Sequence, residues 1–339
     1  MDLLPTDDDL QIAETVRELL RRALPMDLIR RRAEEPDAIA PEQWAECMDS
    51  GLLALGIDER LGGLGLGLAE EALAFREIGR QAAPGPFLSS LLGARVAAFA
   101  GAGDLLEGIV SGDTQIGLVV LRAGASFSGG LLDGEVYLLD ATAADHLLAI
   151  GEDGASIIAR SDFSDIERVP GLDPGTRLEV ARAASVAGSV RVEGSDTRSR
   201  ALVLAAALLA GVAEACRDAS TVHAKTREQF GRPIGVNQAI KHRCADMAVQ
   251  AEAATSQVLY AAAAIDAEQV DAVFQASVAH IVASHAAVEN AQNTVQVHGG
   301  MGYTWEHDSH LFVKRARVWA QALSHTAADR DVVLSAAIV

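Results

Sequence analysis

The sequence feature that most restricts the fold is the long helical pattern of apolar residues in residues 195–339. Its first member is the run ALVLAAALLAGVA at residues 201–213, which is too short to span a bilayer and suits a buried helix. A second stretch covers about residues 238–265, a third ends at Gly299 and Gly300, and a last one begins near His310. Four long helices joined by short turns predict a four-helix bundle.

Helical periodicity also marks the first 113 residues, where apolar side chains form two stripes. The stripes consist of Ile12, Val16, Leu19 and Leu20, and of Leu68, Ala72, Phe75 and Ile78. Between them lies GGLGLG at residues 62–67, which resembles a phosphate-binding loop only loosely because no strand precedes it. We predict that it connects two helices and uses the backbone freedom of glycine.

Residues 114–194 have a different pattern, with short β-rich runs separated by glycine, aspartate and serine. The runs are IGLVV, EVYLL, ASIIA and SVRV. Asp133 and Gly134 are predicted to form a tight hairpin turn. The expected fold class is α+β, with an N-terminal helical domain (1–113), a small, shortened middle β domain (114–194) and a C-terminal four-helix bundle (195–339).

Composition limits the partners and the compartment. A net charge of -19 argues against nucleic acid or an anionic membrane surface, since the protein's field repels both. Three scattered cysteines, Cys47, Cys216 and Cys244, are typical of a reduced protein. The N-terminal MDLLPTDDDL has no basic or apolar region of a signal peptide, so we expect a cytoplasmic protein.

Positive charge is nevertheless concentrated in KTREQFGRPIGVNQAIKHR, residues 225–243. Gly231, Arg232 and Pro233 predict a helix break that exposes the amides of the following helix. Those amides and the nearby guanidinium groups suit a phosphate or pyrophosphate, and Phe230 offers a surface to a flat ring. The alternative is a solvated charged turn with Phe230 in the core.

Three stretches resemble the acyl-CoA dehydrogenase family. They are REQFGRPIGVNQAIKHRCADM (227–247), QVHGGMGYTWEHDSHLFVKRAR (296–317) and WAECMDSGLLALGIDERLGGLGLGLAEEALAFREIGR (44–80). The resemblance covers nearly the whole chain and implies the acyl-CoA dehydrogenase fold, with FAD bound between subunits. It implies oxidation of an acyl-CoA thioester to the 2,3-enoyl thioester, in which a glutamate removes the α proton and the flavin accepts a hydride. Electrons would pass to an electron-transferring flavoprotein.

The same resemblance assigns the cofactor residues. The RxxFG motif falls on Arg227, Gln229 and Phe230, which would reach the adenosine pyrophosphate of an FAD held mainly by the neighbouring subunit. The QxxGG motif falls on Gln296, Gly299 and Gly300, whose backbone would approach the same diphosphate closely. The resemblance places His242 and His298 near the flavin or in structural roles.

Two departures from the family bear on catalysis. Leu323 stands at the usual position of the catalytic glutamate, and Ala201 stands at the position that a minority of the family uses. Neither side chain accepts a proton, and a positioned base contributes about 10² to 10⁴ in rate. The segment RAGASFSGG (122–130) is also shorter than the family's flavin-facing loop.

These departures predict a non-catalytic subunit of a heteromeric enzyme, similar to the actinobacterial heterotetramers of steroid side-chain degradation. Its partners would be a homologous subunit with the catalytic glutamate, which shares the FAD, and an acyl-CoA substrate. A first alternative is a self-sufficient homomer that uses Glu306 as the base.

A second alternative is a structural or metal-binding helical module with His307, Asp308 and His310. We predict no metal site there, and expect these residues to form hydrogen bonds within a loop and the next helix start. FVKRAR (312–317) is either an anion patch for coenzyme A or an ordinary helix face.

Overall fold

The structure is a computed structural model that describes residues 4–194 and 196–336, so the Ser195 boundary of the predicted bundle and its last three residues lie outside the described residues. The chain forms two compact units. Unit 1 comprises Met1–Arg17, Ala72–Ala83 and Leu202–Val339, and unit 2 comprises Glu18–Glu71 and Pro84–Ala201. The division at residues 113 and 194 stays a prediction.

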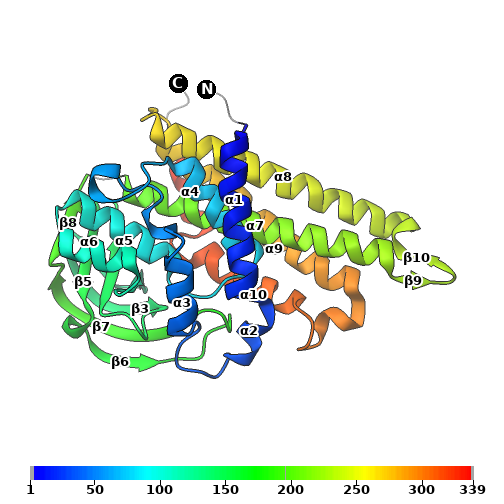
Figure 1. Cartoon of the computed structure of the whole chain (residues 1–339), viewed down its shortest axis with the longest axis horizontal. Coiled ribbons are helices and arrows are strands. Elements are labelled where there is room, and N and C mark those ends of the chain that lie inside the picture. The colour runs from blue at the N-terminus through cyan, green and yellow to red at the C-terminus, as the bar shows by residue number, and fades with distance from the viewer. Residues whose placement is uncertain (1–3, 195, 337–339) are drawn as a thin grey trace. The chain divides into compact units, whose positions relative to one another are not determined.

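Helices occupy the N-terminal part of the chain, as predicted (Figure 1). They are α1 (Asp7–Ala23), α2 (Met26–Arg31), α3 (Pro41–Met48), α4 (Leu68–Arg80), α5 (Phe87–Phe99) and α6 (Gly103–Ser111), with short 3₁₀ turns η1 (Leu52–Ala54) and η2 (Glu59–Leu61). The second predicted stripe lies on α4, and all four of its side chains are buried. GGLGLG forms the irregular connection between η2 and α4, which confirms that prediction.

Unit 2 contains an eight-stranded sheet in the order β6-β7-β3-β1-β4-β5-β8, with β2 paired to β3. The strands are β1 (Ile116–Leu121), β2 (Ser126–Ser128), β3 (Leu131–Leu139), β4 (His146–Ile150), β5 (Gly154–Ala159), β6 (Ser164–Arg168), β7 (Leu178–Ala187) and β8 (Val190–Glu193). Only β1 and β4 pair in parallel. Helix α5 packs on β1, β4, β5 and β8 (Figure 1). Alternate side chains, among them Leu138, Leu147 and Ile158, build a separate core inside the sheet.

The predicted turn at Asp133 and Gly134 is wrong. Both residues lie within β3, where the pairing with β7 shifts register between Leu132 and Gly134. Gly134 has φ +106°, and a Cβ there would lie 2.8 Å from the Cα of Ala125. The Asp-Gly pair therefore serves a β-bulge, which needs the same backbone freedom as a turn. The turn itself uses Gly129 and Gly130, both with positive φ, between β2 and β3.

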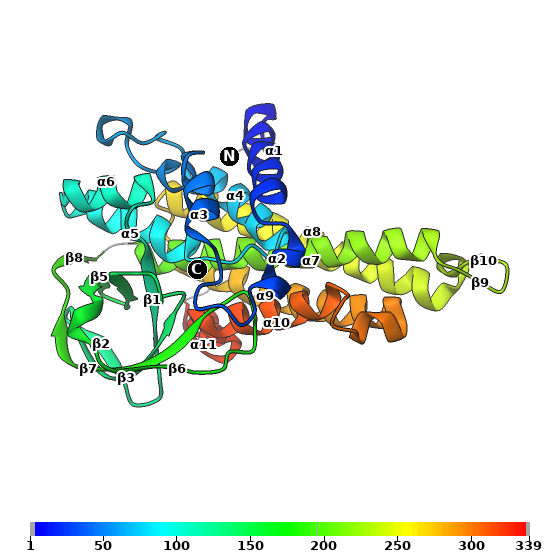
Figure 2. The same cartoon turned by 60° about the horizontal axis from the view of Figure 1, so that its bottom comes forward.

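Unit 1 contains the predicted long helices, which are α7 (Thr197–Thr226, from Leu202 onward), α8 (Gln238–Asp266), α9 (Ala272–His298) and α10 (Ser309–Ala322). The last predicted helix is interrupted after Ala322, and a further helix, α11 (Thr326–Ser335), follows. Figures 1 and 2 both show α7 and α8 running side by side to a small hairpin that joins them. The Asn290 amide on α9 donates to the carbonyls of Ala213 on α7 and Met247 on α8, at 3.1 and 3.0 Å.

Among the described residues, α7 alone is long and apolar enough to cross a membrane, by length and composition. Its most apolar 18-residue window is 83% buried inside the protein. This burial favours a core helix, as the run at residues 201–213 predicted.

Two glycines bring α4 and α7 into close contact. A Cβ at Gly211 would lie 1.9 Å from the Arg76 carbonyl oxygen, and one at Gly79 would lie 1.8 Å from that of Leu208. Charged groups continue the contact, since Arg80 of α4 donates to Glu214 at 2.7 Å and to Asp218 at 2.6 Å on α7. The two helices can approach this closely only where neither has a side chain.

Gly211→Ala is therefore expected to destabilise the protein by about 1–3 kcal/mol through overpacking. The direction is diagnostic, because glycine to alanine within a helix ordinarily stabilises by about 1 kcal/mol. The free energy of unfolding, measured in urea, tests this. Gly103→Ala in α6 is the control, since a Cβ there meets nothing within 4 Å. Equal stability of the two variants would contradict the expectation.

Candidate functional site

A two-residue hairpin presents the predicted RxxFG residues. It joins β9 (Glu228–Gln229) to β10 (Arg232–Pro233), with Arg232 opposite Gln229. The Arg227 carbonyl accepts a hydrogen bond from the Ile234 N–H at 2.9 Å. Both turn residues have positive φ, +55° at Phe230 and +75° at Gly231. This is the backbone of a type I′ turn, which matches the twist of its flanking strands.

Phe230 is fully exposed, with a relative accessible surface of 101%. The alternative that placed it in the core is therefore wrong. An aromatic residue in the left-handed region costs about 1–2 kcal/mol, so the hairpin holds a strained residue with its ring in solvent. A strained, exposed aromatic ring contributes nothing to the core and is suited to contact with another molecule.

The strain gives a prediction that separates stability from binding. Phe230→Asn should leave the melting temperature unchanged or raised, because asparagine followed by glycine fits a type I′ turn better than phenylalanine does. The same change should weaken binding of an adenine-containing ligand by about tenfold, since stacking of a base on an aromatic ring is worth about 1–3 kcal/mol. Thermal unfolding and calorimetric titration measure the two effects.

A matched control is Phe99→Asn, at another exposed phenylalanine at the end of α5 in unit 2. Its ring lies 5.8 Å from the guanidinium carbon of Arg95, and its loss should not affect ligand binding. A lower melting temperature for Phe230→Asn, or equal binding by both variants, would contradict the prediction.

The QxxGG residues lie at the C-terminal end of α9. Gln296, Gly299 and Gly300 are all exposed. Gly299 has φ 62° and ψ -138°, a conformation that only glycine adopts readily. A Cβ at either glycine would meet no atom within 4 Å. The chain's own packing thus leaves this backbone bare, which permits close approach by a ligand.

The structure brings the two motifs together through a stack of histidines. His223 lies one turn before Arg227 on α7, and its ring centroid is 4.2 Å from that of His298, the last residue of α9. The His298 centroid is in turn 4.4 Å from that of His307, in the turn before α10. Neither His223 nor this histidine stack was predicted from the sequence. The four-residue spacing of His223 and Arg227 corresponds to about one helical turn and could have indicated that the two residues lie close together.

Hydrogen bonds also fasten α7 to α9 near the stack. The Ser220 hydroxyl lies 3.1 Å from the Thr294 hydroxyl, which lies 3.1 Å from the Cys216 carbonyl oxygen. Burial is the main cause that lowers the pKa of His223 from its ordinary value, and His298, Arg227 and His307 lower it further.

Exposed cations surround this end of the helices. Lys225, Arg227, Arg232 and Lys241 are all exposed, and Arg243 donates to the Asn293 amide oxygen on α9. The predicted helix break is in fact the hairpin followed by a 3₁₀ turn, η4 (Ile234–Val236). In the described chain, Asn237 begins α8 without a side-chain capping bond, so the first amides of α8 remain available to an anion. The exposed cations, the uncapped amides of α8 and the exposed glycine backbone are together suited to bind a diphosphate.

The two positions at which the family resemblance predicts the catalytic base both carry apolar side chains. Leu323 is a half-buried residue at the end of α10, and Ala201 is buried in α7. Between Leu323 and the last described residue, Asp329 is the first carboxylate in the sequence. Its two oxygens are 2.7 Å from His280 Nδ1 and 2.6 Å from Ser324 Oγ. Asp329 is thus an internal anchor, which no local pattern could predict because His280 lies on a different helix.

The histidines of the alternative metal-binding module, His307 and His310, form hydrogen bonds with residues close to them in the sequence. The Ser309 N–H donates to His307 Nδ1 at 3.2 Å, and His310 Nε2 donates to the Trp305 carbonyl oxygen at 3.1 Å. This confirms the expected hydrogen bonding within the loop and the next helix start. Glu306 is exposed in the same turn.

Residues 312–317 form neither a uniform anion patch nor a solvated face. Phe312 and Arg315 are buried, and Arg315 donates to the Ala83 carbonyl oxygen at 3.0 Å. Lys314 lies over the Trp305 ring, with its nitrogen 5.0 Å from the ring centroid. Arg317 lines a cavity.

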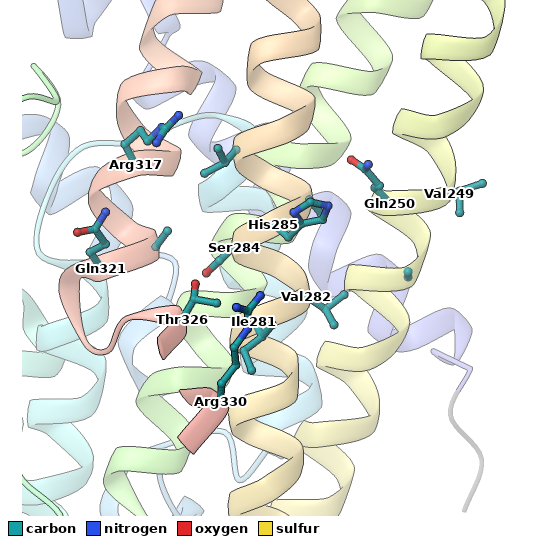
Figure 3. A pocket seen from close by; sticks show the side chains of 14 residues that line it. Val249, Gln250, Ile281, Val282, Ser284, His285, Arg317, Gln321, Thr326 and Arg330 are labelled. Carbon is teal, nitrogen blue, oxygen red and sulfur yellow. The ribbon is translucent and has the colours of Figure 1, made fainter. Parts of the chain in front are cut away.

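That cavity, of about 640 Å³, lies among α8, α9, α10 and α11 of unit 1 (Figure 3). Figure 3 shows Ser284 of α9 near Thr326 and Arg330 of α11. The Ser284 hydroxyl and the Gln250 amide oxygen, which both belong to its lining, are buried without a hydrogen-bond partner in the described chain. No aspartate or glutamate is among the described lining residues, so the cavity offers no carboxylate base.

Two family profiles match the sequence. Residues 197–323 match the acyl-CoA dehydrogenase C-terminal domain, and residues 6–103 match its N-terminal domain. The acyl-CoA dehydrogenase IpdE2 of Mycobacterium tuberculosis is 33% identical over 322 residues, which cover 95% of this chain and 94% of that protein.

Solved structures are similar over the same extent. A steroid acyl-CoA dehydrogenase, the Tcur3481-Tcur3483 G363A variant, superposes with a TM-score of 0.85 at 25% identity and covers 96% of each chain. The ChsE4-ChsE5 complex from Mycobacterium tuberculosis has a TM-score of 0.87 at 23% identity, over 99% of this chain and 100% of that chain. The second match, at this identity, shows the fold alone.

Proposed function

Because this chain belongs to the acyl-CoA dehydrogenase family, we propose that it is one subunit of a heteromeric, FAD-dependent acyl-CoA dehydrogenase. In this proposal it completes the FAD site of a homologous partner subunit, and the partner supplies the catalytic glutamate. The observation that carries the proposal is a contrast within the chain. Phe230 and the Gly299–Gly300 backbone face solvent, while Leu323 and Ala201 occupy the positions of the base.

The residues at the ends of α7 and α9 fit the adenosine diphosphate part of FAD. Arg227 would pair with a phosphate, and Phe230 would offer its ring to the adenine. Gly299 and Gly300 would let backbone amides approach the diphosphate, because no atom of the chain lies within 4 Å of their Cβ positions. Gln296 and Gln229 are exposed on either side and can donate amide hydrogens.

The flavin, when bound, would accept the hydride from the substrate's β carbon. The chain's own residues would bind and orient the cofactor, and none of those at the two base positions would move the α proton. A positioned base contributes about 10² to 10⁴ in rate, so the chain alone is expected to be inactive. Glu306 is exposed in a turn, and nothing in its surroundings favours the self-sufficient alternative.

The compared proteins support the heteromeric type and the substrate class. The ChsE4-ChsE5 structure is a complex of two differently named chains, and the Tcur3481-Tcur3483 structure is called a steroid acyl-CoA dehydrogenase. We therefore propose a steroid side-chain CoA thioester as the substrate and an electron-transferring flavoprotein as the electron acceptor. Exposed apolar residues on α8 and the loop after it, Val249 and Val270, favour an assembly over a monomer.

Purification of the chain alone and with a homologous partner tests the proposal. The chain alone should be colourless and should not oxidise acyl-CoA thioesters. The coexpressed pair should be yellow and active in a dye-reduction assay. A yellow, active homomer of this chain would overturn the heteromeric proposal, and an inactive pair in which only the partner binds FAD would overturn the shared site.

A further inference from the structure

The three stacked histidines have no part in the function proposed so far. His223, His298 and His307 come from α7, α9 and the turn before α10, and their rings are tilted by 32° and 53° in successive pairs. The rings are therefore tilted against one another in a row. Consistent with this geometry, no group of histidine, cysteine or acidic residues in the described chain is arranged to hold a metal ion.

Hydrogen bonds fix two of the rings. His298 Nδ1 donates to the Thr294 carbonyl oxygen at 2.8 Å, so His298 carries a proton there and keeps Nε2 for another partner. His307 Nδ1 accepts from the Ser309 N–H at 3.2 Å. These bonds hold the middle ring, His298, against His223, and the outer ring, His307, against His298. His298 is also the residue directly before Gly299.

The groups that act on His223 are cationic or can become so. They are Arg227 directly after α7, His298 on α9 and His307 before α10. Two carboxylates, Glu306 and Asp308, are the sequence neighbours of His307. From α8, Arg243 is held against α9 by Asn293, and the neighbouring Lys241 is exposed. No carboxylate is among the groups that act on His223, and half-burial adds to the cost of a charge. Burial and these neighbours lower the pKa of His223 and so favour its neutral form when no ligand is bound.

We propose that this stack is a proton-accepting part of the diphosphate site. When a diphosphate ester binds beside Arg227 and Gly299, one imidazole takes up a proton from solvent and faces the ligand as a cation. No bond of the ligand changes, and the proton comes from the buffer. The inference rests on the proposed function, because it needs the diphosphate at this end of α7 and α9.

The sign of the pH dependence follows from linkage. A bound anion favours the charged imidazole, so the pKa of the stack is higher with ligand than without it. Affinity must then rise as pH falls from above the ligand-bound pKa to below the ligand-free pKa. A difference of one unit between these pKa values makes binding tenfold tighter at the lower pH.

The probe is ADP-ribose, and the protein is the complex of this chain with its homologous partner, freed of FAD. ADP-ribose carries an adenosine diphosphate ester, but it lacks the phosphate monoester proton that titrates near pH 6. Its own charge is therefore constant, and any change in affinity between about pH 6 and pH 8 belongs to the protein. Calorimetric titration at both pH values gives the ratio of affinities, and the C2 protons of the histidines, followed by NMR, report the midpoints directly.

The expected result is severalfold tighter binding at pH 6 than at pH 8 for the wild type, rising toward tenfold as the pH falls below the ligand-free pKa. His223→Phe keeps a flat ring in the stack and should reduce this ratio to less than about twofold. His298→Phe is a second variant, in case the first disturbs folding. His285→Phe is the control, since His285 is exposed on α9 outside the stack and should keep the full ratio.

Different failures have different meanings. Equal affinity at both pH values in the wild type, or an unchanged ratio in both stack variants, would overturn the proton-linked role and leave the diphosphate site intact. No binding of ADP-ribose at either pH would overturn the diphosphate site itself, and the inference with it.

Discussion

Arg227→Gln should lower the FAD retained by the complex of this chain with its homologous partner by about 10- to 100-fold. A hydrogen bond to a charged group contributes about 1.5–3 kcal/mol, and the change removes both the guanidinium charge and its paired donors. Arg227 is exposed and forms no ion pair in the described chain, so folding should not suffer. FAD absorbance per complex after gel filtration measures the loss.

The matched control is Arg232→Gln, which removes the same charge from the same hairpin. Arg232 is also exposed, but the family motif gives it no contact with the cofactor. Its effect should stay below about threefold and should fade at high salt, as expected for a general attraction. Equal losses for the two variants would show that only net charge matters and that the assignment of Arg227 is wrong.

Asp329→Ala should lower the free energy of unfolding by about 2–5 kcal/mol, because it removes a buried carboxylate that accepts hydrogen bonds from two buried side chains. Asp329 is 1% exposed, and its carboxylate holds both His280 of α9 and Ser324 in the turn between α10 and α11. The alanine would leave two buried polar groups unsatisfied. Urea unfolding of the chain at neutral pH measures the effect.

Two further variants in α11 show how the change in the free energy of unfolding of Asp329→Ala should be interpreted. Asp329→Asn keeps the shape and one acceptor oxygen, and should cost about 1–3 kcal/mol. Asp331→Ala changes an exposed carboxylate two residues later and should remain within about 0.5 kcal/mol of the wild type. If Asp329→Ala were no worse than Asp331→Ala, the carboxylate would not be the anchor of this turn.

The cavity among α8, α9, α10 and α11 contains buried polar groups without a hydrogen-bond partner in the described chain. Arg317 and Arg330 line it together with Ser284 and Gln250. Its lining is mainly apolar, and Val249 beside it is exposed. These features agree with a surface that is covered in an assembly, which is the state that the proposed function requires.

Much of the fold could be predicted because buried helices leave strong local patterns. The stripe of α4 marks one buried face, and the apolar run of α7 is buried on every side. Prediction failed where the same residues are compatible with more than one backbone conformation. Asp133 and Gly134 suit a hairpin turn and a β-bulge equally, and only the pairing of β3 with β7 decided between them.

The sequence by itself determined the long helices, the β region between helical parts, the clustered cations and the apolar side chains of Leu323 and Ala201. These are properties of single segments, and the chain's chemistry sets them without reference to distant residues. Tertiary structure alone decided that Phe230 is exposed to solvent and that His298 packs between His223 and His307. It also decided that Asp329 forms a hydrogen bond with His280. Each depends on residues far apart in the sequence, whose distances are fixed only when the helices pack.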